Sequence, residues 1–151
     1  GILSGRGQLV FNPLHLAAIY TAFVNEGNMI QPYLRMTEPA EPTVWVEQAF
    51  TAEAAEIVKN DMVQVVENPE GTAHACQMDG ITLAGKTGTA EIKDSQEDTT
   101  GTELGWLGIL TPDAGEQDAF LLLTMTEDVK DRGGSGYVVS KTAELLGSWL
   151  E

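Results

Sequence analysis

A single lysine near the middle of the chain stands between glycines and hydroxyl residues, in the run AGKTGTAE at Ala84–Glu91. The ammonium group of Lys86 can bind an anion, and the hydroxyls of Thr87 and Thr89 can donate further hydrogen bonds to it. Glycine at position 88 lets another backbone approach closely, because it has no side chain. We therefore expect a strand edge that binds a carboxylated peptide through Lys86, Thr87, Gly88 and Thr89.

The same letters also match the phosphate-binding loop G-x-x-x-x-G-K-[ST] over Gly80–Thr87. Such a loop follows a buried strand and opens a helix whose N-terminus faces the phosphates. The segments before Gly80 are polar and predict no buried strand. Gly88 would fall in the first turn of the helix, and the threonines around it favour extended backbone. This context favours a strand, and a nucleotide-binding protein is kept only as an alternative.

K-T-G is also one of the motifs of the penicillin-binding proteins and β-lactamases. The longer run Gly85–Glu91 resembles the third motif of a high-molecular-weight penicillin-binding protein, a D,D-transpeptidase of cell-wall synthesis. Arg6 stands where many members carry glutamine. Three further segments resemble this family, namely the G-x-G loop and P-x-x-[LM]-A helix at 5–17, the G-T-A segment Gly71-Thr72-Ala73, and the next strand, Leu104–Pro112. Glu91 and Asn12-Pro13 resemble most the class B, low-affinity branch linked to antibiotic resistance.

The two other motifs of that family are missing from the chain. No serine is followed by lysine three residues later or by asparagine two residues later, for Ser4, Ser95, Ser135, Ser140 and Ser148 alike. In the family both motifs lie N-terminal to this region. We therefore expect residues 1–151 to be a C-terminal fragment of a transpeptidase domain, with the anion-binding edge but without the nucleophile, and inactive alone.

The resemblance implies a mechanism and a set of partners. A serine attacks the D-Ala-D-Ala stem peptide of peptidoglycan, releases D-Ala and passes the acyl group to an amine, and β-lactams mimic this substrate. Lys86 and Thr89 would be catalytic: Lys86 steers the carboxylate and supports proton transfer, and the backbone N–H of Thr89 is an oxyanion donor. The hydroxyls of Thr87 and Thr89 would bind the carboxylate, and Gly88 would keep the strand open. No cofactor or metal is implied, and the parent would act at the extracytoplasmic face of the bacterial membrane, anchored by an upstream segment.

Two functions from other classes stay open. A receptor domain that senses β-lactams could share the same three motifs and use them to signal. A protein-interaction module could use the strand edge without chemistry.

Length and composition set the outer limits. The chain has 151 residues, a hydrophobic content of 42% and a formal charge of −15. These values fit one globular domain and argue against nucleic acid as a partner, because its phosphates would be repelled. No hydrophobic run approaches the length of a membrane span. One cysteine, Cys76, excludes an internal disulfide, and we expect it to be an incidental residue of a polar loop.

The patterns predict two helices before the K-T-G run. Asn12-Pro13 is a cap and first-turn proline, and the helix after it is expected to stop at Gly27 with four residues at helical spacing, Leu16, Ile19, Tyr20 and Phe23. Gln31–Leu34 and Val44–Val46 could pair as a small hairpin. Thr51 can cap a second helix that ends at Asn68-Pro69 and carries the apolar residues Ile57, Val58, Met62, Val65 and Val66.

Three strands and a helix are expected after them. The strands are Ile81–Ile92, Leu104–Leu110 and Ala119–Thr126, with a polar, solvated connection at 93–103. The final helix follows a glycine-rich turn at 133–136. Its buried face is expected to be broad, with Val138, Thr142, Leu145 and Trp149 on one side and Val139, Ala143, Leu146 and Leu150 beside them.

The order of elements predicts an α+β fold, an antiparallel meander with flanking helices. The resemblance implies a partial penicillin-binding transpeptidase fold, similar to the serine β-lactamases, with the K-T-G strand at one sheet edge. The strand Ala119–Thr126 is expected to be an exposed edge, so that the chain self-associates.

Overall fold

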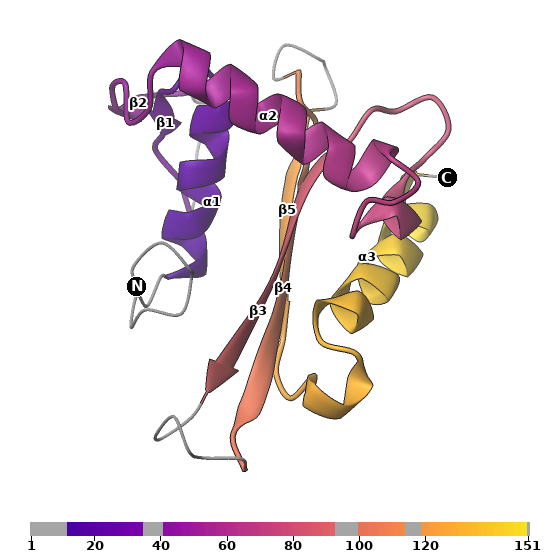
Figure 1. Ribbon diagram of the computed structural model, residues 1–151. Helices are drawn as coiled ribbons and strands as arrows, with labels where there is room; N and C mark the ends of the chain where they lie inside the picture. Colours follow the sequence, from indigo (N-terminus) through magenta and orange to yellow (C-terminus); the bar gives the residue numbers. More distant parts are fainter. Residues whose placement is uncertain (1–11, 35–40, 93–99, 114–118, 151) are drawn as a thin grey trace.

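The computed structural model describes residues 12–34, 41–92, 100–113 and 119–150. The G-x-G loop at 5–7 and most of the polar connection at 93–103 lie outside these residues. Within these residues the elements follow one another (Figure 1) in the order α1 Pro13–Phe23, β1 Met29–Ile30, β2 Val44–Val46, α2 Ala52–Glu67, η2 His74–Cys76, β3 Ala84–Ile92, β4 Thr102–Leu110, β5 Leu121–Thr126, η3 Lys130–Arg132 and α3 Ser135–Leu150, where η marks a short 3-10 helix.

Helix α1 begins as its sequence predicts but ends earlier. The side chain of Asn12 accepts a hydrogen bond from the N–H of Leu14 at 2.8 Å, which satisfies a free donor of the first turn. The helix ends at Phe23, four residues before Gly27. Gly27 instead closes the following turn at φ 87°, and a Cβ there would lie 1.9 Å from the carbonyl oxygen of Phe50.

The small hairpin forms, but its first strand is shifted from the prediction. β1 is Met29–Ile30 rather than Gln31–Leu34, and it pairs antiparallel with β2. Met29 is buried beside α1, whereas Tyr33 and Leu34 are exposed. Because Met29 packs in the core, the strand lies earlier in the chain than the strand propensities of Tyr33 and Leu34 suggest.

Helix α2 matches its predicted bounds. The hydroxyl of Thr51 accepts the N–H of Ala54 at 3.1 Å, and the helix ends before Asn68. Its buried residues are Ala55, Met62 and Val66. Two residues expected to pack, Ile57 and Val58, are instead exposed.

The main sheet is the predicted three-stranded antiparallel meander, in the order β3-β4-β5. Lys86 is paired with Gly108, and Leu110 with Leu121 on the other side of β4. β3 begins at Ala84, and Ile81 forms only an isolated bridge with Met78. Among the described strands, β3 and β5 are therefore the two edges.

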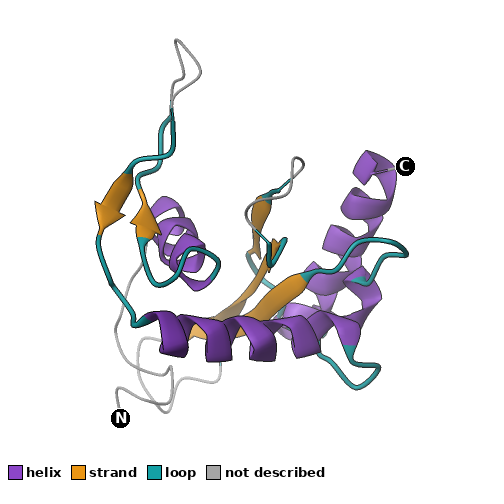
Figure 2. Cartoon of the chain, turned by 90° about the horizontal axis from the view of Figure 1, so that it is seen from above, coloured by secondary structure: helices purple, strands orange, loops and turns teal. Residues whose placement is uncertain are grey.

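The helices cover both faces of this sheet. A Cβ on Gly108 would meet the ring of Tyr20 in α1, whereas a Cβ on Gly105 would meet Val138 in α3. These glycines are three residues apart on one strand, and because side chains alternate between the two faces, they face opposite sides of the sheet. α1 and α3 accordingly lie on opposite sides of the strands, and α2 crosses beside β3 (Figures 1 and 2).

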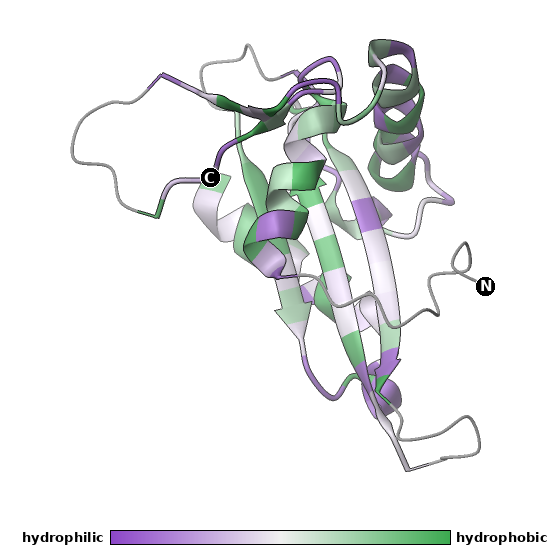
Figure 3. Cartoon of the chain, turned by 90° about the vertical axis from the view of Figure 1, so that its left-hand side faces the viewer, coloured by the Kyte–Doolittle hydropathy of each residue, from purple (hydrophilic) through white to green (hydrophobic). Residues whose placement is uncertain are grey.

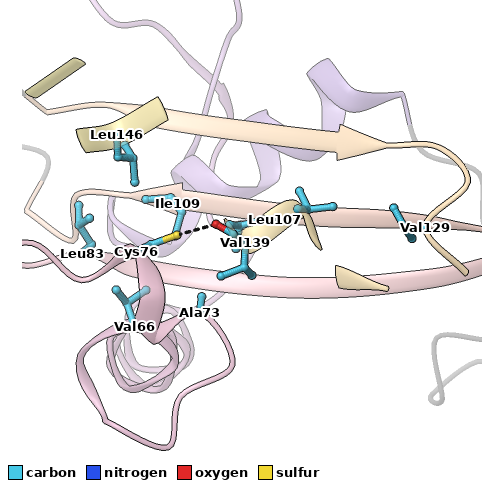
Figure 4. Packing of buried hydrophobic residues seen from close by; sticks show 10 residues of the cluster. Val66, Ala73, Cys76, Leu83, Leu107, Ile109, Val129, Val139 and Leu146 are labelled. Carbon is cyan, nitrogen blue, oxygen red and sulfur yellow. Dashed lines mark hydrogen bonds between the residues drawn. The ribbon is translucent and has the colours of Figure 1, made fainter. Parts of the chain in front are cut away.

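The larger core lies between α2, α3 and the sheet (Figure 4), and it contains Val66, Ala73, Cys76, Leu83, Leu107, Ile109, Val129, Val138, Val139 and Leu146. Cys76 is not in a polar loop, as expected from sequence, but in η2 and fully buried. Its Sγ lies 3.5 Å from the carbonyl oxygen of Val139. Burial raises the pKa of the Cys76 thiol to about 11, so this thiol stays protonated and unreactive near neutral pH.

Helix α3 buries only part of the broad face that its sequence predicts. Val138 and Thr142 are buried, as expected, but Leu145 and Trp149 are 47% and 57% exposed. Val139 and Leu146, expected beside these residues, are buried in the core. All these residues have helical spacing, and contact with β4 and η2 selects the part of the face that is buried.

The helices α1 and α2 each mix hydrophilic and hydrophobic segments (Figure 3). Within the described ranges, no helix is long and apolar enough to cross a membrane.

Candidate active-site edge

The edge strand β3 is covered at its start and open along the rest of its length. Ala84 and Gly85 are buried, and the residues from Lys86 to Ile92 are half-buried or exposed. α2 causes the change, because a Cβ on Gly85 would lie 2.9 Å from Cγ2 of Val66. The last residue of α2, Glu67, also accepts the N–H of Leu83 at 2.9 Å through its carboxylate. The open part of the edge thus begins at Lys86.

Lys86 lies on the face of the sheet that α1 covers. Its pairing partner Gly108 shares that face, and the ring of Tyr20 lies against Gly108. The Lys86 side chain is exposed, and its Nζ donates to the carbonyl oxygen of Thr87. Burial raises the pKa of the Tyr20 phenol, so this neighbour stays neutral and does not add to the charge at this face.

Thr87 and Thr89 point to the opposite face. The hydroxyl of Thr87 lies 3.0 Å from that of Thr72. The hydroxyl of Thr89 accepts the backbone N–H of Ser135, the first residue of α3, at 3.2 Å. Lys86 and the two hydroxyls can therefore reach one ligand only if that ligand lies along the edge itself, between the two faces.

Thr89 and the Thr72–Thr87 pair each keep one hydroxyl hydrogen that can be donated. Thr89 uses its oxygen as an acceptor toward Ser135, which leaves its O–H available. Thr72 and Thr87 share one hydrogen bond but carry two hydroxyl hydrogens, so one remains. A carboxylate accepts hydrogen bonds only, and this edge offers it two O–H donors and one ammonium.

The two glycines around the lysine differ in their surroundings. A Cβ on Gly85 would collide with the core, whereas a Cβ on Gly88 would meet only Cβ of Trp106, at an ordinary 3.7 Å. Packing inside the described structure therefore requires glycine at 85 but not at 88. The role of Gly88 toward a ligand that approaches the edge stays a prediction from the sequence.

Comparison with known proteins gives the family of the chain. The family described as "Penicillin binding protein transpeptidase domain" matches residues 2–146. The chain belongs to this family. Penicillin-binding protein 3 of Bacillus subtilis (strain 168) is 43% identical over 144 residues, which are 95% of this chain and 21% of the relative.

Two further matches come from other bacteria. The probable peptidoglycan D,D-transpeptidase PbpC of Pseudomonas aeruginosa is 33% identical over 83 residues, 55% of this chain and 14% of that protein. The solved structure of PBPA from Mycobacterium tuberculosis superposes with a TM-score of 0.69 at 19% identity, over 97% of this chain and 34% of that one. The chain thus spans about a fifth or less of the two sequence relatives, and it shares the fold of transpeptidase domains.

The fold also bears on the competing phosphate-loop interpretation. In that motif the lysine opens a helix, whereas Lys86 and Thr87 lie inside β3, which continues to Ile92. In the transpeptidase family the K-T-G residues belong to a strand, so family membership explains the match at Gly80–Thr87 without a phosphate-binding loop.

Sequence reasoning missed two residues that contact the edge. The sequence indicates Thr72 only as part of the G-T-A segment, and Ser135 only as part of a strand-to-helix turn. They lie 15 and 46 residues from their partners Thr87 and Thr89. No local pattern reports such contacts, and the family resemblance of Gly71-Thr72-Ala73 was the one signal that pointed toward Thr72.

Proposed function

We propose that this chain supplies the carboxylate-binding edge of a peptidoglycan D,D-transpeptidase. The observation that carries the proposal is the position of Lys86, a cation placed where the β3 edge changes from covered to open. An extended peptide can pair with the open part, and its terminal carboxylate then stops beside the covered part. A substrate that ends in a carboxylate, such as the D-Ala-D-Ala stem peptide, fits an edge that is blocked at one end.

The roles of the edge residues follow from their chemistry. Lys86 would attract the substrate carboxylate and assist proton transfer, while Thr87 and Thr89 would donate hydroxyl hydrogens to it. The backbone N–H of Thr89 would be one oxyanion donor, a contact worth about 10²–10³ in rate. Gly88 would let the substrate backbone come close.

The covalent steps need a nucleophile that this chain does not contain. A serine of the S-x-x-K motif, elsewhere in the whole protein, would attack the amide carbonyl between the two D-Ala residues. The terminal D-Ala leaves as an amine after gaining a proton, and the amine of a second stem peptide then displaces the serine to form the cross-link. A β-lactam would acylate the same serine. The chain alone would be inactive, and the whole protein would work at the extracytoplasmic face of the membrane.

Replacing Lys86 with alanine in the full-length protein tests the proposal. We expect the second-order rate of acylation by a fluorescent penicillin to fall about 10²-fold, because a charge-assisted contact worth about 2–3 kcal/mol is lost. The melting temperature should barely change, since Lys86 is exposed. Lys86→Arg should restore the rate only in part, because a planar guanidinium does not replace a compact ammonium.

The matched control is Lys141→Ala, which removes another exposed lysine that pairs with Glu144 on α3. It should leave the rate unchanged. An unchanged rate in Lys86→Ala would contradict the proposal. Turnover of stem peptides separates an enzyme from a sensor: a protein that penicillin acylates but that forms no cross-links would instead be a β-lactam receptor.

A further inference from the structure

The G-T-A segment next to β3 is fixed on both sides of its threonine. A Cβ on Gly71 would lie 2.3 Å from the carbonyl oxygen of Val65 in α2, so only glycine fits there. Ala73 is fully buried, and its N–H donates to the same oxygen at 3.0 Å. His74 donates from Nδ1 to the carbonyl oxygen of Val66 at 2.9 Å. The backbone position of Thr72 is therefore set by its neighbours.

Thr72 itself is exposed and does not belong to the core. Its hydroxyl lies 3.0 Å from the hydroxyl of Thr87, across from the open edge of β3. Packing does not require a threonine at position 72, yet the packed neighbours Gly71 and Ala73 hold Thr72 against the hydroxyl of Thr87. This geometry is suited to orienting the Thr87 hydroxyl.

We propose that Thr72 is a positioning residue that orients the Thr87 hydroxyl toward a ligand carboxylate. This inference rests on the proposed function of the β3 edge. A carboxylate can only accept, so Thr87 must donate its hydrogen to the ligand. The hydrogen between the two threonines then has to come from Thr72, which gives the chain Thr72 O–H to Thr87 Oγ1 and Thr87 O–H to carboxylate. Each bond in such a chain polarises and strengthens the next one.

The effect should depend on the charge of the ligand. A hydrogen bond to a carboxylate is roughly twice as strong as one to a neutral acceptor, so the orientation of Thr87 matters most for the charged form. A penicillin and its methyl ester differ in this group and share the same reactive ring. The ratio of their acylation rates therefore reports the positioning role, whereas a general loss of structure would slow both.

The experiment compares variants of the full-length transpeptidase. Thr72→Val keeps the shape but removes the hydroxyl, and we expect about a 5- to 10-fold slower acylation by the free acid and less than about a 2-fold change for the ester. Thr72→Ser should restore the parental rate. Thr72→Ala is a second variant without the hydroxyl, and melting temperatures check that each variant folds.

Thr87→Val separates this inference from the proposed function. If Thr87→Val slows acylation by the free acid and Thr72→Val does not, the inference about Thr72 is wrong and the proposed function of the edge stands. If neither Thr87→Val nor Lys86→Ala slows acylation by the free acid, the proposed function fails and the inference fails with it. Equal losses for acid and ester in Thr72→Val would make Thr72 merely structural. In a double variant that carries both Thr72→Val and Thr87→Val, acylation by the free acid should be little slower than in Thr87→Val alone, because the two hydroxyls act in one chain.

Discussion

At the scale of residues, the two glycines that flank Lys86 have different reasons to be glycine. Gly85 faces the core, where a methyl group would lie 2.9 Å from Val66 Cγ2 and 3.0 Å from Ile109 Cδ1. Gly88 has room for a methyl group on the side of Trp106. One glycine permits the packing of α2 on the sheet, and the other is free to face a ligand.

Alanine at each position tests this difference. Gly85→Ala should lower the free energy of unfolding by about 1–3 kcal/mol through overpacking, whereas Gly88→Ala should change it by less than about 0.5 kcal/mol. Urea denaturation of both variants provides the measurement. In the full-length protein, Gly88→Ala should nevertheless slow acylation by penicillin. Similar stability losses in the two variants would show that Gly88 is also a packing residue.

Single residues also show where sequence reasoning reaches its limit. The position of Lys86, Thr87 and Thr89 on one strand could be predicted from adjacent residues, whereas their chemistry stays a prediction. Their division between two faces follows from the two-residue period of a strand, yet the partners on each face do not. Thr72 and Ser135 meet the edge only because α2 and α3 bring distant segments to it.

At the scale of elements, local signals predicted the starts of helices better than their buried faces. Asn12 and Thr51 cap α1 and α2 through their own side chains, which is a property of neighbouring residues. The buried stripe of α3 depends on what lies opposite, and Leu145 and Leu146 were equally acceptable to a helical period. Cys76 and Val139 meet across this contact, and it places Leu146 inside.

Adjacent leucines of α3 give a matched test of that stripe. Leu146→Ala removes a fully buried side chain and should lower the free energy of unfolding by about 2–5 kcal/mol. Leu145→Ala, at a position that is 47% exposed, should cost under about 1 kcal/mol. Thermal or urea unfolding of the two variants distinguishes them. A larger loss for Leu145→Ala would show that Leu145, and not Leu146, is the core residue.

At the scale of the whole molecule, the order of the elements determined the sheet. Three strands joined by short polar connections favour an antiparallel meander, and β3-β4-β5 has that topology. The coverage of its faces did not follow from the order. It depends on close approaches at Gly105 and Gly108, which admit α3 and α1 to opposite sides of the sheet.

The open edge at β5 leads to a prediction about association. Among the described strands β5 pairs only with β4, and its side chains are half-buried apart from the exposed Met125. An edge strand with unpaired backbone groups recruits another strand. We therefore expect the 151-residue chain to form dimers or larger assemblies despite its charge of −15, as measured by light scattering over a range of concentrations.

A lysine on the edge strand tests whether β5 is the surface responsible. Met125→Lys should weaken association, because charged side chains on an edge disfavour strand addition. Ile57→Lys is the control, since Ile57 is an exposed apolar residue on α2 and the substitution changes the net charge equally. The control should associate like the parent. A parent that stays monomeric at high concentration would contradict the prediction, and equal weakening by both substitutions would assign the association to charge or general hydrophobicity instead of to the β5 edge.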